Sequence, residues 1–176
     1  LQETETYAES SVCRRKLLLH YFGEEYTKDN CGMCDNCLHP KEKIEAKQPL
    51  LIVLQAVKAL GGNFRQEYVI DFVKGRGTDD IKDHKHNLLE EFGLGEKENP
   101  KIWTPVIRQA MLEGYLKKDV ENYGLLKLTA AGKQFLKEPK SFMIVMDKEF
   151  KTDEIDESMV GGTSVADPEL YAMLKD

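Results

Sequence analysis

Regularly spaced apolar positions in the middle of the chain predict three helices. In each stretch the apolar residues recur with the period of about 3.6 that places them on one face of a helix, and a glycine-containing segment follows. Pro49 suits the first turn of the first helix, while Gly61 and Gly62 follow its last apolar residue, Leu60. We expect these helices at residues 49–60, 68–73 and 103–113.

The pattern then changes to one typical of a β-hairpin. Residues 115–120 and 125–128 favour strands, and residues 121–124 favour the turn between them. Thr129 is placed to cap a short final helix, which ends by Pro139. Three helices followed by a hairpin is the element order of a winged helix, whose third helix usually faces duplex DNA and whose hairpin is the wing. Since many winged helices bind only protein, this order leaves DNA contact open.

The N-terminal region has a separate pattern. We expect one helix over residues 8–22, with leucines on one side and the basic triplet 14–16 on another. The triplet suits either a solvated helix face or a contact with a phosphate backbone or an adjacent domain. A charged run after Pro40 indicates a linker, so we place a domain boundary near residue 46.

Four cysteines are the clearest chemical signal in the sequence. Cys31, Cys34 and Cys37 have C-x2-C-x2-C spacing, and Cys13 lies eighteen residues upstream of them. Gaps of two residues let consecutive sulfur atoms face one small volume, and Gly32 allows the tight turn that this needs. With all four cysteines as ligands, the sequence predicts a structural Zn²⁺ site that has no open position for water or substrate.

The cysteine spacing leaves two other interpretations open. A [4Fe–4S] cluster uses a similar spacing with one remote cysteine, and its colour would distinguish it from zinc. Disulfides are less compatible with closely spaced C-x2-C pairs in a Lys- and Glu-rich chain that shows no signal peptide. His39 is expected outside the metal sphere, because four cysteines already complete it.

The net charge of −6 is distributed unevenly along the 176 residues. Residues 1–49 carry 7 basic and 9 acidic side chains, residues 50–139 carry 14 and 13, and residues 140–176 carry 4 and 9. The acidity therefore lies mainly in the C-terminal segment, and the central segment permits a basic face without demonstrating one. Neither a run of eighteen apolar residues nor a secretory leader is present, so we expect a cytoplasmic protein. Because the first residue is Leu1, we also expect a segment of a longer chain.

Several motifs resemble the C-terminal region of RecQ-type DNA helicases. The sequences CRRKLLL (13–19), YFGE (21–24) and CGxCDxC (31–37) are similar to the zinc-binding subdomain of that family. A second group of motifs is similar to the family's RQC winged helix, and a third to the opening of its HRDC domain. The second group comprises VID (69–71), the turn with Gly75, FGLG (92–95), Trp103, GYL (114–116) and LKLT (126–129), and the third is residues 167–174.

The resemblance implies a mainly α-helical fold with a small β-hairpin, in which a four-cysteine zinc-binding helical subdomain precedes a winged helix. It divides the chain into the zinc-binding subdomain (1–45), the RQC winged helix (46–139) and an acidic linker with the start of an HRDC domain (140–176). Within the last part, the apolar residues 143–146 suit an added strand as well as a free tether.

The resemblance also implies a parent enzyme that uses ATP and Mg²⁺ to unwind DNA in the 3′-to-5′ direction for repair and recombination. Its motor domains would lie in the same parent chain, and the segment would grip duplex or forked DNA irrespective of sequence, near the bacterial nucleoid. No G-x-x-x-x-G-K-[ST] loop is present to cradle a triphosphate, so we expect this segment alone to lack ATPase activity.

Carried onto matching positions, the resemblance makes Cys13, Cys31, Cys34 and Cys37 the zinc ligands. Tyr123, at the hairpin tip, is a candidate for stacking on a base pair at a fork, although it also suits packing on its own hairpin. Other polar positions suit either phosphate contact or solvated surface. These phosphate candidates are Lys74, Arg76 and Thr78 in one turn, Lys101 before the third helix, and Arg108 on it.

Two rival functions fit the same residues. One is a stand-alone, zinc-stabilised winged-helix regulator without a motor, and the other is a protein-interaction platform that avoids DNA. DNA binding measured at several salt concentrations distinguishes a DNA-binding protein from a platform. In either case we expect Trp103 in the core and His84 and His86 on the surface.

Overall fold

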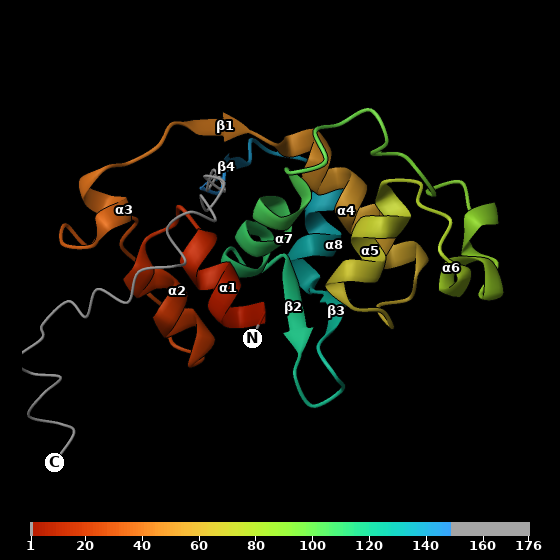
Figure 1. Cartoon of the computed structure of the whole chain (residues 1–176), viewed down its shortest axis with the longest axis horizontal. Helices are drawn as coiled ribbons and strands as arrows, with labels where there is room; N and C mark the ends of the chain where they lie inside the picture. The colour runs from red at the N-terminus through yellow and green to blue at the C-terminus, as the bar shows by residue number, and fades with distance from the viewer. Residues whose placement is uncertain (1, 149–176) are drawn as a thin grey trace, which may run out of the picture.

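The computed structural model describes residues 2–148, so the HRDC-like motif at residues 167–174 lies outside the described residues. Helices α1, α2 and α3 lie at one end of the molecule, and the later helices and the hairpin of β2 and β3 form a larger unit beside them (Figure 1). Among the described helices, none is long and apolar enough to cross a membrane. The elements are α1 (Gln2–Glu9), α2 (Arg14–Tyr21), α3 (Asp35–Leu38), β1 (Lys43–Glu45), α4 (Lys47–Ala59), α5 (Gln66–Val73), α6 (Asp79–Asp83), the 3-10 helix η1 (His86–Leu88), α7 (Trp103–Leu112), β2 (Leu116–Asp119), β3 (Leu125–Leu128), α8 (Ala130–Lys137) and β4 (Met143–Val145).

The prediction of one continuous helix over residues 8–22 is wrong, because the chain leaves helical geometry between α1 and α2. The side-chain amide of Asn36 donates to the backbone oxygens of Ser10 (2.9 Å) and Val12 (2.7 Å). Ser10 Oγ also accepts a hydrogen bond from the backbone N–H of Val12 (3.0 Å). These local and long-range bonds compete with helical ones, and they place the buried Cys13 at the start of α2.

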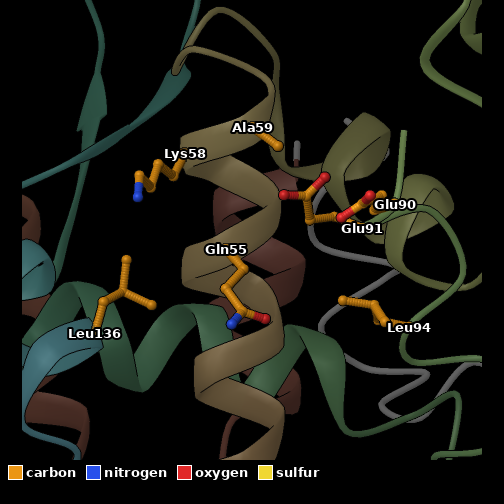
Figure 2. A pocket seen from close by; sticks show the side chains of 7 residues that line it. All are labelled: Gln55, Lys58, Ala59, Glu90, Glu91, Leu94 and Leu136. Atoms are coloured by element: carbon orange, nitrogen blue, oxygen red, sulfur yellow. The ribbon is translucent and has the colours of Figure 1, made fainter. Parts of the chain in front are cut away.

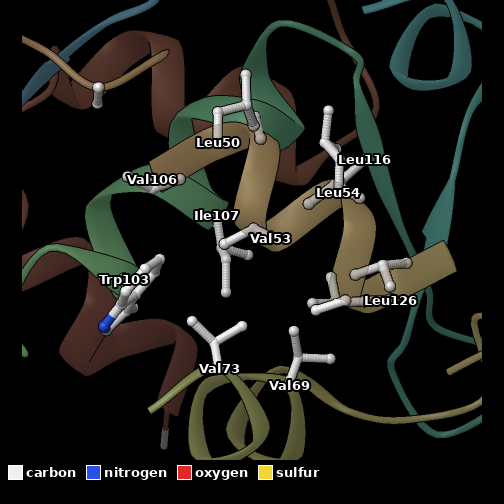
Figure 3. Close-up of a cluster of buried hydrophobic side chains, with 14 of the residues drawn as sticks. Leu50, Val53, Leu54, Val69, Val73, Trp103, Val106, Ile107, Leu116 and Leu126 are labelled. Carbon is white, nitrogen blue, oxygen red and sulfur yellow. The ribbon is translucent and has the colours of Figure 1, made fainter. Parts of the chain in front are cut away.

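The hydrophobic core lies between three helices at the predicted positions. α4 packs against both α5 and α7, and Leu50, Val53 and Leu54 of α4 lie in the same cluster as Val69 and Ile107 (Figure 3). Every one of these side chains is at most 1% exposed. This layer of apolar residues explains the periodicity of the sequence and positions the hairpin that follows.

The hairpin forms as predicted and completes a winged helix. β2 and β3 pair antiparallel, with Leu116 opposite Leu128. The backbone N–H of Leu126 donates to Phe64 O (2.9 Å), so the segment between α4 and α5 adds a short edge to this sheet. The loop of the hairpin projects away from the helices (Figure 1). Thr129 caps α8, because its Oγ accepts from the backbone N–H of Gly132 (3.1 Å).

A second, two-stranded sheet joins distant parts of the sequence. β1 pairs antiparallel with β4, and Ile44 lies opposite Ile144. Phe142 and Ile144 are each 1% exposed and belong to the core cluster. Residues 143–145 therefore form the added strand rather than a free tether, and the folded unit continues beyond Pro139.

Candidate metal centre and DNA-binding surface

The four cysteine sulfur atoms converge on one small volume. They all lie within 4.8 Å of one another, and Cys31 Sγ is 3.8 Å from Cys37 Sγ. Cys13 directly precedes α2, Cys34 directly precedes α3, and Cys37 lies within α3, while Cys31 lies in the segment that leads to α3. None of the four is in a disulfide. His39 is exposed and lies outside the cluster, as expected.

The sulfur geometry fits one Zn²⁺ ion better than a [4Fe–4S] cluster. Tetrahedral zinc with Zn–S bonds of about 2.3 Å places its sulfur ligands about 3.8 Å apart. The separation of the Cys31 and Cys37 sulfurs is 3.8 Å. A cluster instead binds each cysteine to a different iron atom, which holds the sulfurs farther apart. The backbone N–H of Cys31 also points to Cys37 Sγ (3.4 Å), a contact that stabilises a thiolate.

The cysteine thiols do not ionise alike in the absence of a cation. Backbone N–H groups of Met33 and Cys34 lower the pKa of Cys31 to about 6, whereas burial raises the pKa of Cys37 to about 12. Four thiolates at this separation would repel one another, so a divalent cation is needed to keep all four charged. Structural Zn²⁺ supplies this charge, and its four sulfur ligands leave no position for a reactant.

Asp35, which follows Cys34, connects the cysteine turn to two other segments. Arg14 donates through Nε to Asp35 Oδ1 (3.1 Å) and through Nη2 to Oδ2 (3.0 Å). Lys148 Nζ donates to Asp35 Oδ2 (2.7 Å). These bonds, Arg14 first, hold the pKa of Asp35 well below its usual range. Arg14 therefore serves the subdomain's own structure.

The other two members of the basic triplet differ in their surroundings. Lys16 Nζ donates to Asp29 Oδ1 (3.2 Å), which lowers the pKa of Asp29. Arg15 is exposed. Two of the three side chains thus form ion pairs inside the N-terminal region, which accounts for most of the triplet without DNA.

The three predicted phosphate contacts between α5 and α6 differ in their exposure and in their partners within the protein. Thr78 caps α6, since its side chain accepts from the backbone N–H of Ile81 (3.4 Å). Arg76 forms an ion pair with Asp71 (3.4 Å), yet its side chain remains 65% exposed. Burial, followed by the charge of Arg76, lowers the pKa of Lys74. Arg76 is therefore accessible to solvent at this turn, whereas the hydroxyl of Thr78 is engaged in the helix cap.

Arg108 does not lie on the surface, contrary to the expectation that it contacts phosphate. It is 4% exposed and forms an ion pair with Asp147. The helical period placed Arg108 opposite the apolar face of α7, but the segment around β4 covers that side as well. A guanidinium in this position has no access to a DNA backbone, so we remove it from the candidate surface. Lys101, which precedes α7, is exposed.

The wing is accessible, in contrast to α7. None of the ten residues of α7 is exposed. Tyr123, at the hairpin tip, is 82% exposed, so little of its surface is covered by its own hairpin. Lys117 and Lys118 are exposed on β2. These two lysines are not among the candidates predicted from the sequence. Their place in the predicted strand that leads to the turn with Tyr123 could have indicated them.

His86 is less exposed than predicted, because it belongs to an aromatic cluster at the start of α5. Its Nδ1 lies 2.6 Å from Tyr68 Oη, and the Tyr68 ring stacks on Phe64 with centroids 4.1 Å apart. Burial, followed by the charge of His84, lowers the pKa of His86. His84 itself is exposed, as predicted. The cluster attaches the α6–η1 segment to α5.

A surface hollow of about 550 Å³ beside α4 does not suit DNA or a nucleotide. Glu90 and Glu91 lie on one side of α4 together with Leu94, and Lys58 lies on the other side with Leu136 (Figure 2). Two carboxylates at the rim repel phosphate groups. Lys58 is the one basic residue among the described residues of the lining, so two acidic groups and one basic group leave the hollow with a net negative charge.

The four-cysteine centre and the wing define the class of the protein as a zinc-binding helical subdomain joined to a winged helix. The RQC domain family matches residues 40–153, and the RecQ zinc-binding family matches residues 1–38. The chain belongs to the RQC domain family, preceded by a RecQ zinc-binding region, and is thus a RecQ C-terminal region.

Relatives with known names agree with this assignment. The chain is 31% identical over 174 residues to the ATP-dependent DNA helicase RecQ of Pasteurella multocida, covering 98% of the chain and 26% of the relative. It is 29% identical over 171 residues to the ATP-dependent DNA helicase RecQ of Haemophilus influenzae, covering 96% and 28%. It is also 29% identical over 126 residues to the ATP-dependent helicase SGS1 of Saccharomyces cerevisiae, covering 65% and 9%. The chain thus spans little more than a quarter of the length of its bacterial relatives.

Proposed function

We propose that this chain is the DNA-holding module of a RecQ-type helicase that unwinds DNA in the 3′-to-5′ direction. In this proposal Cys13, Cys31, Cys34 and Cys37 bind a structural Zn²⁺ that braces the N-terminal region, and the winged helix holds duplex DNA at a fork. Membership of the RQC family supports the helicase parent, since its bacterial relatives are named as ATP-dependent DNA helicases. Repair and recombination are the processes in which such fork unwinding would act.

The observation that carries the DNA contact is the placement of Tyr123. Its side chain is 82% exposed, and its backbone φ of +56° lies in the left-handed region that bulky residues rarely adopt. Exposure of an apolar ring to water at such a tip does not stabilise the fold. Stacking of the ring on an exposed base pair would contribute about 1–3 kcal/mol to the free energy of DNA binding. We therefore assign Tyr123 to the end of the duplex at a fork, with the wing rather than α7 as the contacting element.

Cationic side chains around the wing and the α5–α6 turn would contact phosphates. Lys117 and Lys118 are exposed on the wing, and Arg76 and Lys101 are exposed on the helical unit. Phosphate contacts carry no base information, and Gln109 on α7 donates to Glu113 (2.8 Å) instead of facing a groove. Binding should therefore be independent of sequence and fall with salt, by a log–log slope of about −0.9 per phosphate neutralised.

ATP and Mg²⁺ belong, in this proposal, to motor domains elsewhere in the same parent chain. The sequence contains no G-x-x-x-x-G-K-[ST] loop, and the hollow beside α4 is acidic. The segment itself would bind DNA without hydrolysing ATP. A protein that binds DNA irrespective of sequence would associate with the bacterial nucleoid.

Fluorescence anisotropy with forked and blunt duplex DNA tests the proposal. We expect Tyr123→Ala to weaken fork binding by about 5- to 150-fold, the range equivalent to one lost stacking contact of about 1–3 kcal/mol. The double variant Lys117→Ala/Lys118→Ala should weaken binding to both DNAs and reduce the salt slope. Lys28→Ala, which removes an exposed lysine from the N-terminal region, is the matched control and should bind normally.

The outcomes also separate the rival functions. Absence of salt-dependent DNA binding by the folded, zinc-loaded protein would overturn the proposal in favour of a protein-interaction platform. Normal fork binding by Tyr123→Ala would exclude the stacking role of Tyr123 and leave the rest of the proposal unaffected. Strong preference for one DNA sequence would instead favour a stand-alone regulator.

A further inference from the structure

We propose that residues 141–148, here called the strap, couple metal binding at the four cysteines to the stability of the winged helix. The inference rests on the proposed zinc site but is independent of DNA binding. It assigns to Asp147 and Lys148 a positioning role between two parts of the chain that the sequence suggests are separate domains.

The first half of the strap is fixed to the winged helix. Phe142 and Ile144 are buried in its core, and the Phe142 carbonyl accepts from the backbone N–H of Ala46 (2.8 Å). Glu45 accepts from the Phe142 backbone N–H (2.9 Å) and from Ser141 Oγ (2.5 Å). These bonds lower the pKa of Glu45, so its carboxylate remains charged and continues to accept them. β4 therefore moves with the winged helix.

Asp147, the penultimate residue of the strap, is the counter-ion of a buried arginine. Asp147 accepts from Arg108 of α7, whose Nε and Nη1 are buried without a hydrogen-bond partner in the described structure. Lys41 Nζ donates to the Asp147 carbonyl (3.1 Å). Because a buried guanidinium is costly without a counter-ion, Arg108 depends on the position that the strap gives to Asp147.

The end of the strap is fixed to the metal-binding region. The Lys148 backbone N–H donates to Glu9 O at the end of α1 (2.9 Å). Lys148 Nζ donates to Asp35 Oδ2 (2.7 Å), and Asp35 lies between two of the clustered cysteines. Asp147 and Lys148 are adjacent, so one peptide unit joins the counter-ion of α7 to the cysteine turn. A second contact, between His20 Nε2 of α2 and Met111 O of α7 (3.3 Å), joins the same two parts of the chain without the strap.

Loss of the metal would therefore act on the winged helix through a defined path. Without a cation, the cysteine turn is no longer held together, and Asp35 no longer offers Lys148 a fixed partner. The contact of Lys148 with Asp35 then no longer helps to hold the neighbouring Asp147 in place, so the ion pair of Asp147 with Arg108 is weakened. By thermodynamic reciprocity, a strap that stabilises the winged helix when metal is bound must also strengthen metal binding when the winged helix is folded.

Trp103 makes this coupling measurable. It is the single tryptophan of the sequence, it lies in α7 with Arg108, and it is 1% exposed. Its fluorescence therefore reports unfolding of the winged helix and not of the metal-binding region. The full chain would be melted with Zn²⁺ bound and after chelation, with metal content measured by elemental analysis.

We expect chelation to lower the melting temperature reported by Trp103 by about 4–8 °C in the unaltered chain. In Lys148→Ala the decrease should be less than half as large, and Zn²⁺ affinity should fall about fivefold in competition with a chelator. Lys140→Ala, which removes an exposed lysine just before the strap, is the matched control and should behave as the unaltered chain.

Two results would overturn the coupling. One is a Trp103 transition that chelation does not move, although elemental analysis confirms that Zn²⁺ was bound and removed. The other is a Lys148→Ala variant with the same chelation shift and the same metal affinity as Lys140→Ala. A preparation that never binds Zn²⁺ would instead refute the metal site on which the inference depends.

Discussion

The indole ring of Trp103 lies against Gly95 so closely that no side chain fits between them. A Cβ built on Gly95 would lie 2.2 Å from Cζ2 of Trp103 and 2.5 Å from Cγ1 of Val73. The backbone N–H of Gly95 donates to Val73 O (2.9 Å), which fixes this loop on α5. Two motif positions of the sequence, the last glycine of FGLG and the tryptophan, are thus linked by packing rather than by DNA contact.

Gly95→Ala should therefore destabilise the winged helix by about 1–3 kcal/mol, the usual cost of overpacking a core. Urea denaturation followed by Trp103 fluorescence measures the change. Gly77→Ala is the control, because a Cβ there would lie 3.4 Å from Lys82 Cε, at the end of a flexible side chain. Equal midpoints for the two variants would contradict the packing argument.

Asp147→Asn should be strongly destabilising, since it leaves the buried Arg108 without its counter-ion. We expect a loss of about 3 kcal/mol in the free energy of unfolding, at the low end for a broken buried pair because Asp147 is partly exposed. The double variant Arg108→Met/Asp147→Asn should recover most of this loss, since it removes the buried charge.

Arg108→Met also tests the withdrawal of Arg108 from the DNA surface. The folded variant should bind forked DNA with unchanged affinity and salt slope, because the guanidinium is 4% exposed. A reduced salt slope would return Arg108 to the phosphate contacts.

Asp35→Asn should weaken Zn²⁺ binding although Asp35 is not a ligand. The substitution removes the charged partner of Arg14 and Lys148, which orient the turn that carries Cys34 and Cys37. Loss of such an outer partner lowers metal affinity by about 10- to 100-fold, measurable by chelator competition. Asp71→Asn, which removes a partner of Arg76 far along the chain, should leave metal affinity unchanged.

The ion pair between Asp119 and Lys127 gives the wing a defined acid response. The hydrogen bond from Lys127, followed by that from Asn122, lowers the pKa of Asp119 to about 2. An unfolded chain has an aspartate pKa of about 3.9, so the pair stabilises the folded hairpin above about pH 4. This stabilisation should decrease as the pH falls from about 4 towards 2.

An NMR titration of the Asp119 carboxyl group measures this pKa directly. Lys127→Met should raise it towards the value of an unfolded chain. An unchanged pKa in that variant would mean that Asn122 and the backbone, not Lys127, hold the charge.

The sequence determined much of the secondary structure, because local patterns have local causes. The helical period in α4, α5 and α7 reflects one buried face on each helix, and the caps at Thr78 and Thr129 depend on residues three positions away. The C-x2-C-x2-C spacing likewise specified a turn that gathers sulfur atoms, and Cys13 joined them as predicted.

The surroundings of individual side chains were decided by the tertiary structure, because they depend on segments distant in the sequence. Asn36 interrupts the predicted N-terminal helix by bonding to Ser10 and Val12. β4 returns to pair with β1 and brings Asp147 to Arg108, which converts an apparent surface cation into a buried one. Periodicity describes which residues of a helix share a face, but it contains no information about what later covers the opposite face.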